Sequence, residues 1–363
     1  MRTPAICAAG IALIALAMWY RPAAADDFPP FYRAATLASS HGNVYANPTW
    51  SPRTNAEGRF LPYLRIPFYA AALRPLTAFS YTVARRVWIA ALVLAAFACV
   101  PLFPAATNRF AIALAFSFPL ADALMVGQDI TFVLLIVLAA ARIFSGGREF
   151  LAGLLASLVC IKITWAPAVG MVFLAKSRRG VGGFAVGTAV QLAISFAVGG
   201  MGWPSQYLAI LRNPLLDPEP SRMLSIRELT VSLSLPAAVY MIAAAALYVI
   251  FWFACRRLSL MDGLTLALAL GLIAAPHCKI YDAILLIPLL VKAASLRCWE
   301  GVLACACLTP VFYLMVLMGR LPVLLVGDSL LIVSTLAAAL RLYRDQMTPN
   351  ARHARVPTAM ATP

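Results

Sequence analysis

Two adjacent carboxylates, Asp26 and Asp27, directly follow the first apolar segment of the chain. An ionised carboxylate at a membrane surface can accept the proton of a hydroxyl nucleophile, which is the role of a general base. The same pair could instead cap the helix that follows, because Asp is a favoured N-cap residue and Pro29 with Pro30 suits a helix start. The residue types alone leave both interpretations open.

A second polar group, His277 and Lys279, lies between two apolar runs and is followed by Asp282. A His and a Lys can bind an anionic group or stabilise a leaving oxygen. Asp282 suits the start of the next helix, where a carboxylate complements the helix dipole. A polar turn between two helices, closed by a capping Asp, is the alternative interpretation.

Three further polar positions interrupt apolar sequence. Gln128 follows Gly127, and a Gly beside an amide predicts a broken helix whose end lines a cavity, with simple helix capping as the alternative. Lys162 lies deep inside a long apolar run and needs an acidic partner or an aqueous cleft, unless it snorkels to the interface. Arg222 and Arg227 could neutralise a phosphate or belong to a solvated loop.

The composition places these residues in a membrane protein. Hydrophobic residues make up 63% of the 363 residues, charged residues 12%, and the mean hydropathy is +0.86, whereas a soluble domain carries about 25% charged residues. Long apolar runs predict an all-α polytopic membrane protein. The net charge of +15 comes from Lys and Arg scattered in short loops, which indicates membrane topology rather than nucleic-acid binding.

The sequence contains no motif for a soluble cofactor. It has no P-loop, no Gly-x-Gly-x-x-Gly after a strand and no Gly-x-Ser-x-Gly, so neither ATP nor a soluble nucleotide donor is indicated. The eight Cys lie mostly in apolar runs, and no Cys or His cluster has zinc spacing. We therefore expect no cofactor and no metal.

The apolar runs predict twelve membrane spans, with ten or eleven as alternatives, near residues 5–20, 66–83, 86–104, 108–122, 127–143, 150–174, 181–200, 232–254, 260–275, 279–294, 299–318 and 322–341. Several are shorter than the roughly 20 residues of a full span. Small-residue patterns such as Gly183-x-x-x-Gly187 predict helix-packing faces.

Loop charges orient these spans. The positive-inside rule places Lys176, Arg178, Arg179, Arg256 and Arg257 in the cytoplasm, together with Arg85 and Arg86 if 66–83 crosses. Arg142 and Arg148 then fall on the opposite side, against the rule. The two long loops, about 21–65 and 201–231, share the external face, which therefore receives Asp27, Tyr32, Arg65 and Arg222.

We expect a single transmembrane domain over residues 1–345 and a disordered cytoplasmic tail over 346–363, because the tail is polar. Arg2, an apolar stretch and Ala23 to Ala25 also resemble a cleavable signal peptide. A retained first span, about 24 Å long, would hold Asp26 and Asp27 at the membrane surface.

In their order, these motifs resemble glycosyltransferase family 87, the polytopic polyprenyl-phosphate-mannose-dependent mannosyltransferase-like proteins. The similarity runs over about residues 5–341. The residues that carry it are Asp27-Phe28, Phe31-Tyr32, Ala34-Ala35, Gly42, Tyr45, Leu61-Pro62-Tyr63, Arg74-Pro75-Leu76, Gly127-Gln128, Gly153, Lys162, Ser225-Ile226, Pro276-His277 and Tyr281-Asp282.

The resemblance implies a GT-C type bundle of about twelve helices with an extracytoplasmic active site. It implies a hexosyltransferase of the bacterial inner membrane, with its active site facing the periplasm or exterior. The enzyme would move a hexose, mannose in the best-known members, from a polyprenyl-phosphate sugar to a lipid or glycan hydroxyl by inverting displacement.

The resemblance assigns the catalytic base to Asp27, which directly precedes the Phe of the motif, and leaves Asp26 as the less favoured neighbour. The residues expected to bind the donor phosphate or substrate are His277, Lys279, Arg222, Arg65, Gln128, Lys162 and Tyr32. The chain departs from the family pattern where it reads Leu-Pro-Tyr at 61–63 for Tyr-Pro-Pro, and Lys162-Ile163 for Lys-Pro, which removes a proline kink.

Two other functions compete. A lipid or solute transporter could use Lys162, Asp122 and Asp129 as a pathway, although the sequence lacks two halves with corresponding broken segments. A noncatalytic membrane assembly partner would tolerate substitution of Asp27 and His277.

Overall fold

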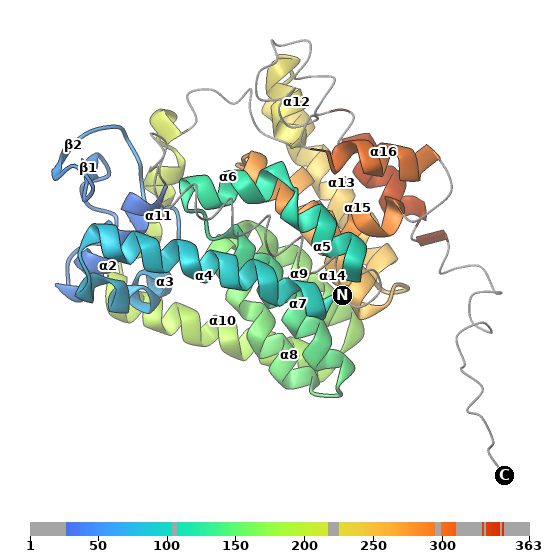
Figure 1. Cartoon of the computed structure of the whole chain (residues 1–363), viewed down its shortest axis with the longest axis horizontal. Helices are drawn as coiled ribbons and strands as arrows, with labels where there is room; N and C mark the ends of the chain where they lie inside the picture. Colours follow the sequence, from blue (N-terminus) through green and yellow to red (C-terminus); the bar gives the residue numbers. More distant parts are fainter. Residues whose placement is uncertain are drawn as a thin grey trace.

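The computed structural model describes residues 27–103, 107–216, 225–294, 299–309, 329, 332–341 and 343–344. These residues form helices and a small antiparallel hairpin of β1 (Trp50–Ser51) and β2 (Ala56–Glu57) (Figure 1). The helical class predicted from the sequence is confirmed, whereas the count of twelve spans is not. Asp26, Arg222, the predicted span 5–20 and the tail from 346 lie outside the described residues.

Two long helices, α4 (Tyr81–Leu102) and α10 (Arg178–Gly199), extend along the molecule and define its two ends. We call the end where α4 begins and α10 finishes the site end. Short elements gather there: α2 (Phe28–Ser39), α3 (Pro67–Ala72), the 3-10 helices η1 (Arg74–Ala78) and η4 (Pro214–Leu216), and α11 (Trp203–Leu211). The short helix α12 (Ile226–Ser232) lies apart from them, at the top of Figure 1.

The remaining helices complete the bundle, and many of their residues belong to the apolar core. They are α5 (Thr107–Ala115), α6 (Phe118–Val126), α7 (Ile130–Ser145), α8 (Glu149–Ala156), η3 (Ser157–Trp165), α9 (Ala166–Lys176), α13 (Ala237–Cys255), α14 (Leu260–Ile273), η6 (Ile280–Leu286), α15 (Ile287–Ala294), α16 (Trp299–Cys307) and the helix Ile332–Arg341. Among the described residues, four segments are long and apolar enough to cross a membrane, namely α4, Glu149–Lys176, α10 and α13, or five if α5 and α6, bent by 52°, form one span. Glu149–Lys176 meets this criterion of length and composition, yet it folds back on itself.

The predicted span 66–83 is wrong. Pro67 begins the short helix α3, Pro75 lies in the 3-10 helix η1, and Ser80 precedes α4. The backbone N–H of Phe68 donates to Ser195 Oγ (3.0 Å), close to the end of α10. The segment is apolar because it packs against α2 and α10 at the site end, and it does not cross the molecule.

The segment expected to span at 150–174 folds back on itself. A straight helix over Glu149–Lys176, 28 residues, would be about 42 Å long. Instead, Ser177 Oγ donates to a Glu149 carboxylate oxygen at 2.5 Å. Lys162 has non-helical backbone angles (φ −123°, ψ 88°) and forms the apex of a hairpin between α8 and α9. The break occurs at Lys162 although Ile163, not proline, follows it.

Glycines let the hairpin approach α10 closely. A Cβ atom on Gly153 would lie 1.8 Å from the carbonyl oxygen of Gly180, and one on Gly183 would lie 2.0 Å from that of Phe150. A Cβ on Gly187 would lie 2.1 Å from Ser157 Oγ. The predicted packing role of Gly183 and Gly187 is thus confirmed, and the contact holds α8 alongside α10.

A Gly153→Ala substitution is expected to destabilise the protein by about 3 kcal/mol, the upper end of the overpacking range, because backbone lies in its way. Gly182→Ala is the matched control on α10: within the described part of the chain nothing lies within 4 Å of its added Cβ. Thermal unfolding in detergent measures both. Equal unfolding temperatures for Gly153→Ala and the unsubstituted protein would contradict this account of the packing.

The hairpin also explains the loop charges. Phe144, at the end of α7, contacts Phe173 of α9, and Lys176 Nζ donates to the Arg256 carbonyl (3.0 Å). The α7–α8, α9–α10 and α13–α14 connections therefore share the end opposite the site. Arg142 and Arg148 lie at that end with the other basic loop residues, and their predicted position on the opposite side from Lys176 is wrong.

Candidate active site

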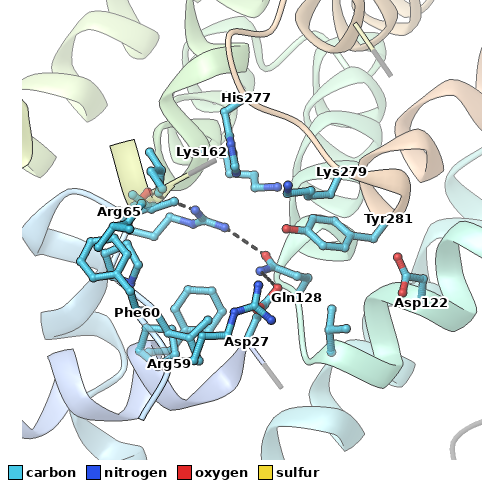
Figure 2. A pocket seen from close by; sticks show the side chains of 18 of the residues that line it. Asp27, Arg59, Phe60, Arg65, Asp122, Gln128, Lys162, His277, Lys279 and Tyr281 are labelled. Atoms are coloured by element: carbon cyan, nitrogen blue, oxygen red, sulfur yellow. Dashed lines mark hydrogen bonds between the residues drawn. The ribbon is translucent and has the colours of Figure 1, made fainter. Parts of the chain in front are cut away.

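A cavity of about 950 Å³ opens at the site end (Figure 2). Its walls come from α2, the loop after Val44, the α6–α7 junction, the apex of the α8–α9 hairpin and the turn before η6. The residues that line it are Asp27, Pro30, Phe31, Thr49, Gly58, Arg59, Phe60, Leu61, Pro62, Leu64, Arg65, Asp122, Val126, Gln128, Lys162, Leu215, Leu216, His277, Lys279, Ile280 and Tyr281.

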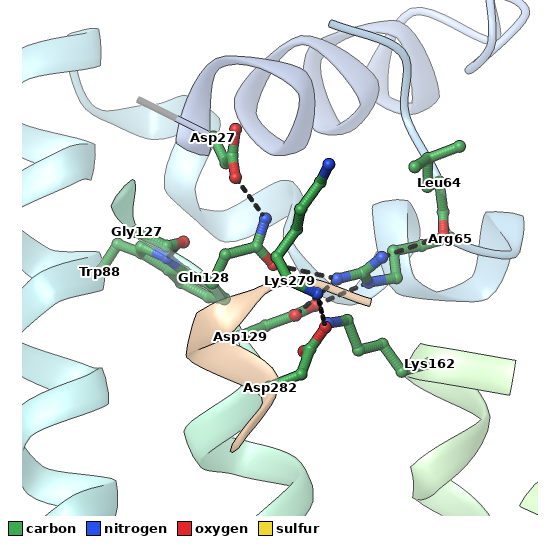
Figure 3. A network of polar contacts seen from close by, with 10 residues as sticks. All are labelled: Asp27, Leu64, Arg65, Trp88, Gly127, Gln128, Asp129, Lys162, Lys279 and Asp282. Atoms are coloured by element: carbon green, nitrogen blue, oxygen red, sulfur yellow. Dashed lines mark hydrogen bonds and ion pairs between the residues drawn. The ribbon is translucent and has the colours of Figure 1, made fainter. Parts of the chain in front are cut away.

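Asp27 occupies the N-cap position of α2, which begins with Phe28, Pro29 and Pro30. Within the described residues its carboxylate makes no capping hydrogen bond to α2. Its Oδ2 accepts a hydrogen bond from Gln128 Nε2 (2.8 Å), and its backbone N–H donates to the Val126 carbonyl (2.7 Å) (Figure 3). The carboxylate lines the cavity, and the capping alternative does not describe it.

Gln128 reaches the cavity because the chain breaks immediately before it. Gly127 adopts the left-handed conformation (φ 74°) that ends α6, which glycine tolerates without steric cost. The indole N–H of Trp88 donates to the Gly127 carbonyl (2.7 Å), which satisfies a backbone group freed by the break. The helix break predicted at this position is confirmed.

Arg65 and Asp129 form an ion pair beside Gln128, with 6% and 0% of their side chains exposed. Two bonds join them, from Nε to Oδ2 (2.8 Å) and from Nη2 to Oδ1 (2.6 Å), and Nη2 also donates to Gln128 Oε1 (3.2 Å). Burial alone would lower the pKa of the Arg65 guanidinium, but the charge of Asp129 outweighs it and raises that pKa above its ordinary value. Arg65 is thus a fixed cation.

Lys162 has the acidic partner that its buried position requires. Its ammonium, at the apex of the hairpin, pairs with Asp282 and lies 5.0 Å from the centre of the Tyr281 ring. The other Asp282 oxygen accepts the backbone N–H of Lys279 (3.0 Å). Snorkelling does not describe Lys162, and Asp282 combines the predicted capping role with an ion pair.

His277 and Lys279 line the cavity from a turn whose backbone is held by other elements. Arg227 of α12 donates to the Pro276 carbonyl, and the Tyr240 hydroxyl donates to that of Ala274 (2.9 Å). In Figure 2, His277 and Lys279 lie on one side of the view and Asp27 on the other, with Gln128 between them. The cavity therefore combines a carboxylate and two basic side chains from distant parts of the chain.

Two predicted site residues are outside this description, and a third lies elsewhere. Asp26 and Arg222 belong to segments that are not described. Tyr32 is absent from the described residues that line the cavity: its hydroxyl donates to the Phe79 carbonyl (2.7 Å), and its ring packs against Tyr81. In this position Tyr32 connects α2 to the start of α4.

The lining residues without a predicted binding role include three that bring a charge or an aromatic ring to the cavity wall. Arg59 and Phe60 follow the β hairpin, and Asp122 was considered only for a transport pathway. The spacing of Asp122, one helical turn before Val126, could have indicated that both face the same cavity. Nothing local distinguishes Arg59 from Arg53, the other exposed arginine of the loop.

The wall formed by Arg59 and Phe60 is held by α2. Buried Arg33 donates from Nη1 to the Trp50 carbonyl and from Nη2 to the Leu61 carbonyl, both at 2.6 Å. Burial lowers the pKa of Arg33 to about 10, so it remains a cation at neutral pH. Among the described residues, no group of three or more His, Cys, Asp or Glu side chains is placed to hold a metal ion.

Comparison with known proteins adds one match. The glycosyltransferase family 87 model matches residues 63–276, well over half of the chain. No curated protein matches, and no solved structure matches. The matched region contains Arg65, Gln128 and Lys162. His277 and Lys279 directly follow it, whereas Asp27 lies in the segment that precedes it. The chain belongs to glycosyltransferase family 87.

Proposed function

We propose that this membrane glycosyltransferase moves a hexose, mannose in the first instance, from a polyprenyl-phosphate sugar to a lipid or glycan hydroxyl. The observation that carries the proposal is that Asp27, His277 and Lys279 line one cavity. A base and an anion-binding pair within one cavity are what transfer from a sugar phosphate requires. The cavity volume of about 950 Å³ is at the upper end of the usual range for ligand pockets.

The reaction is a single in-line displacement. The acceptor oxygen attacks the anomeric carbon while the bond from that carbon to the phosphate oxygen breaks. Asp27 takes the hydroxyl proton, and polyprenyl phosphate leaves with the bonding electron pair. Lys279 and His277 stabilise the phosphate charge, and the anomeric centre is inverted.

The basic connections between helices support an extracytoplasmic site, although Arg85 and Arg86, near the start of α4, lie at the cavity end because 66–83 does not cross. The basic connections at Arg142 to Arg148, Lys176 to Arg179 and Arg256 to Arg257 share the end opposite the cavity, and such loops face the cytoplasm under the positive-inside rule. In a bacterial inner membrane, the cavity then faces the periplasm or exterior. We place residues 1–345 in one transmembrane domain and 346–363 in a cytoplasmic tail.

The ion pairs argue against a transport pathway. Lys162 and Asp129, two of the residues that a pathway would use, are bound to Asp282 and Arg65 in buried pairs. Paired charges of this kind fix the walls of a site, and a transporter would have to separate them in each cycle.

A donor-dependence assay tests the proposed function. Membranes that contain the protein are given a radiolabelled polyprenyl-phosphate hexose or the matching nucleotide sugar, and label in lipid and glycan acceptors is counted. We expect label only from the polyprenyl donor. Lys279→Met should raise the KM for that donor, because it removes a cation from the phosphate site, whereas Lys176→Met, at the opposite end, should not. Transfer from the nucleotide sugar alone, or solute flux without transfer, would refute the proposal.

A further inference from the structure

We infer that Gln128 is a positioning residue for the base: it orients the Asp27 carboxylate, and the buried Arg65–Asp129 pair orients Gln128. This inference rests on the proposed function, since it assigns a role relative to Asp27. It replaces direct substrate binding, the role that the sequence suggested for Gln128 and Arg65.

The chemistry of its two neighbours fixes the orientation of the Gln128 amide. A guanidinium only donates hydrogen bonds and a carboxylate only accepts them. The amide oxygen must therefore face Arg65, at 3.2 Å, and the amide nitrogen must face Asp27, at 2.8 Å. A rotated amide would lose both bonds, so Gln128 presents one N–H to the carboxylate in a defined direction.

Arg65 in turn is fixed on several sides. Its guanidinium makes two bonds to Asp129 and a third to the Leu64 carbonyl (3.0 Å), and it stacks over the Phe31 ring at 5.4 Å. Figure 3 shows the continuous series from Asp129 through Arg65 and Gln128 to Asp27. Gln128 is 7% exposed, so water competes little for these bonds.

The backbone and the carboxylate of Asp27 are held by the same junction. Its N–H donates to Val126 and its Oδ2 accepts from Gln128, on either side of the left-handed Gly127. Both bonds therefore hold the base to the α6–α7 break, although in the sequence Asp27 directly precedes α2. The bond from Gln128 Nε2 to Oδ2 therefore restricts rotation of the Asp27 carboxylate.

Gln128→Glu tests the inference because it retains shape and the bond to Arg65 while replacing the N–H donor with an anion that repels Asp27. We expect kcat to fall about 100-fold, the effect of a small misplacement of a reacting group, with the KM values for donor and acceptor nearly unchanged. Gln128→Met, which removes the donor without adding charge, should also lower kcat. Asn55→Asp, on the exposed turn of the β hairpin and outside the cavity lining, is the control for replacing an amide with a carboxylate and should keep wild-type kcat.

The decisive measurement repeats Gln128→Met in an Asp27→Asn background. A positioning residue acts only through the base, so the second substitution should cause no further loss of rate, whereas a general structural role would add its own loss. A wild-type kcat for Gln128→Met, or a rise in KM alone, would overturn the inference while the proposed function stands. A wild-type rate for Asp27→Asn would instead refute the assignment of the base. Detergent unfolding temperatures, with Gln128→Met as the uncharged variant, separate loss of rate from loss of folded protein.

Discussion

Replacing Asp27 with Asn is expected to lower the rate of sugar transfer about 10²- to 10⁴-fold, the contribution of a general base. The amide has nearly the same shape, and its oxygen can still accept the bond from Gln128 Nε2. The geometry of the cavity is thus retained while the ability to take a proton is lost. Label transferred from a saturating polyprenyl-phosphate sugar measures the effect.

Glu57→Gln is the matched control for Asp27→Asn, because it makes the same chemical change on an exposed residue of β2 outside the cavity lining. It should transfer at the wild-type rate. Asp122→Asn tests the other carboxylate on the cavity wall. Loss of transfer in Asp122→Asn with full transfer in Asp27→Asn would move the base to α6 and contradict our assignment.

Replacing Asp129 with Asn is expected to destabilise the protein by about 3–5 kcal/mol, because it leaves the Arg65 guanidinium buried without its counter-charge. The pair lies entirely within the fold, with 0% of the Asp129 side chain exposed. Thermal or denaturant unfolding in detergent measures the change, again with Glu57→Gln as the control.

A double substitution distinguishes the effect of the ion pair on stability from its effect on sugar transfer. Arg65→Met with Asp129→Leu removes both charges, and such apolar replacements of a buried pair are often neutral for stability. We expect stability to recover in the double variant while transfer stays low, since Gln128 has lost the guanidinium that orients it. Unchanged stability in Asp129→Asn alone would show that the pair contributes nothing to the fold.

The broken helix at Gly127 and the joint cavity of Asp27 with His277 could be predicted from sequence because each depends on local signals. A glycine before an amide inside an apolar run predicts a helix break. Asp27 and His277 are both predicted on the external face of the membrane, so they can line one cavity. The pairing of Arg65 with Asp129, 64 residues apart, could not be predicted, because nothing local specifies which charge finds which partner.

Hydropathy could not distinguish segments that cross the membrane from apolar segments that begin and end on the same side. Residues 66–83 are mostly apolar despite Arg74, yet they pack across the site end. Glu149–Lys176 is as apolar as α4 and α10, yet it folds back at Lys162. Each of these two segments counts as one crossing too many. The second extra crossing restores the correct side after Lys176, so the predicted side is wrong only for the residues between the two segments. The conflict at Arg142 and Arg148 was the single sequence signal of this inversion, and Gln128 lies within the same stretch.

The two hydrogen bonds from Arg33 to Trp50 and Leu61 bear on how the cavity can widen for a substrate. Asp27 is the N-cap residue of α2, but its backbone N–H and its carboxylate are bonded to Val126 and Gln128 at the α6–α7 break. Arg33, within α2, holds the cavity wall at Trp50 and Leu61. A tilt of α2 would therefore move that wall while these two bonds keep the base at the α6–α7 break. Widening the cavity for a bulky glycan would then change the distance from Asp27 to Arg59 and Phe60 without changing its position relative to Gln128.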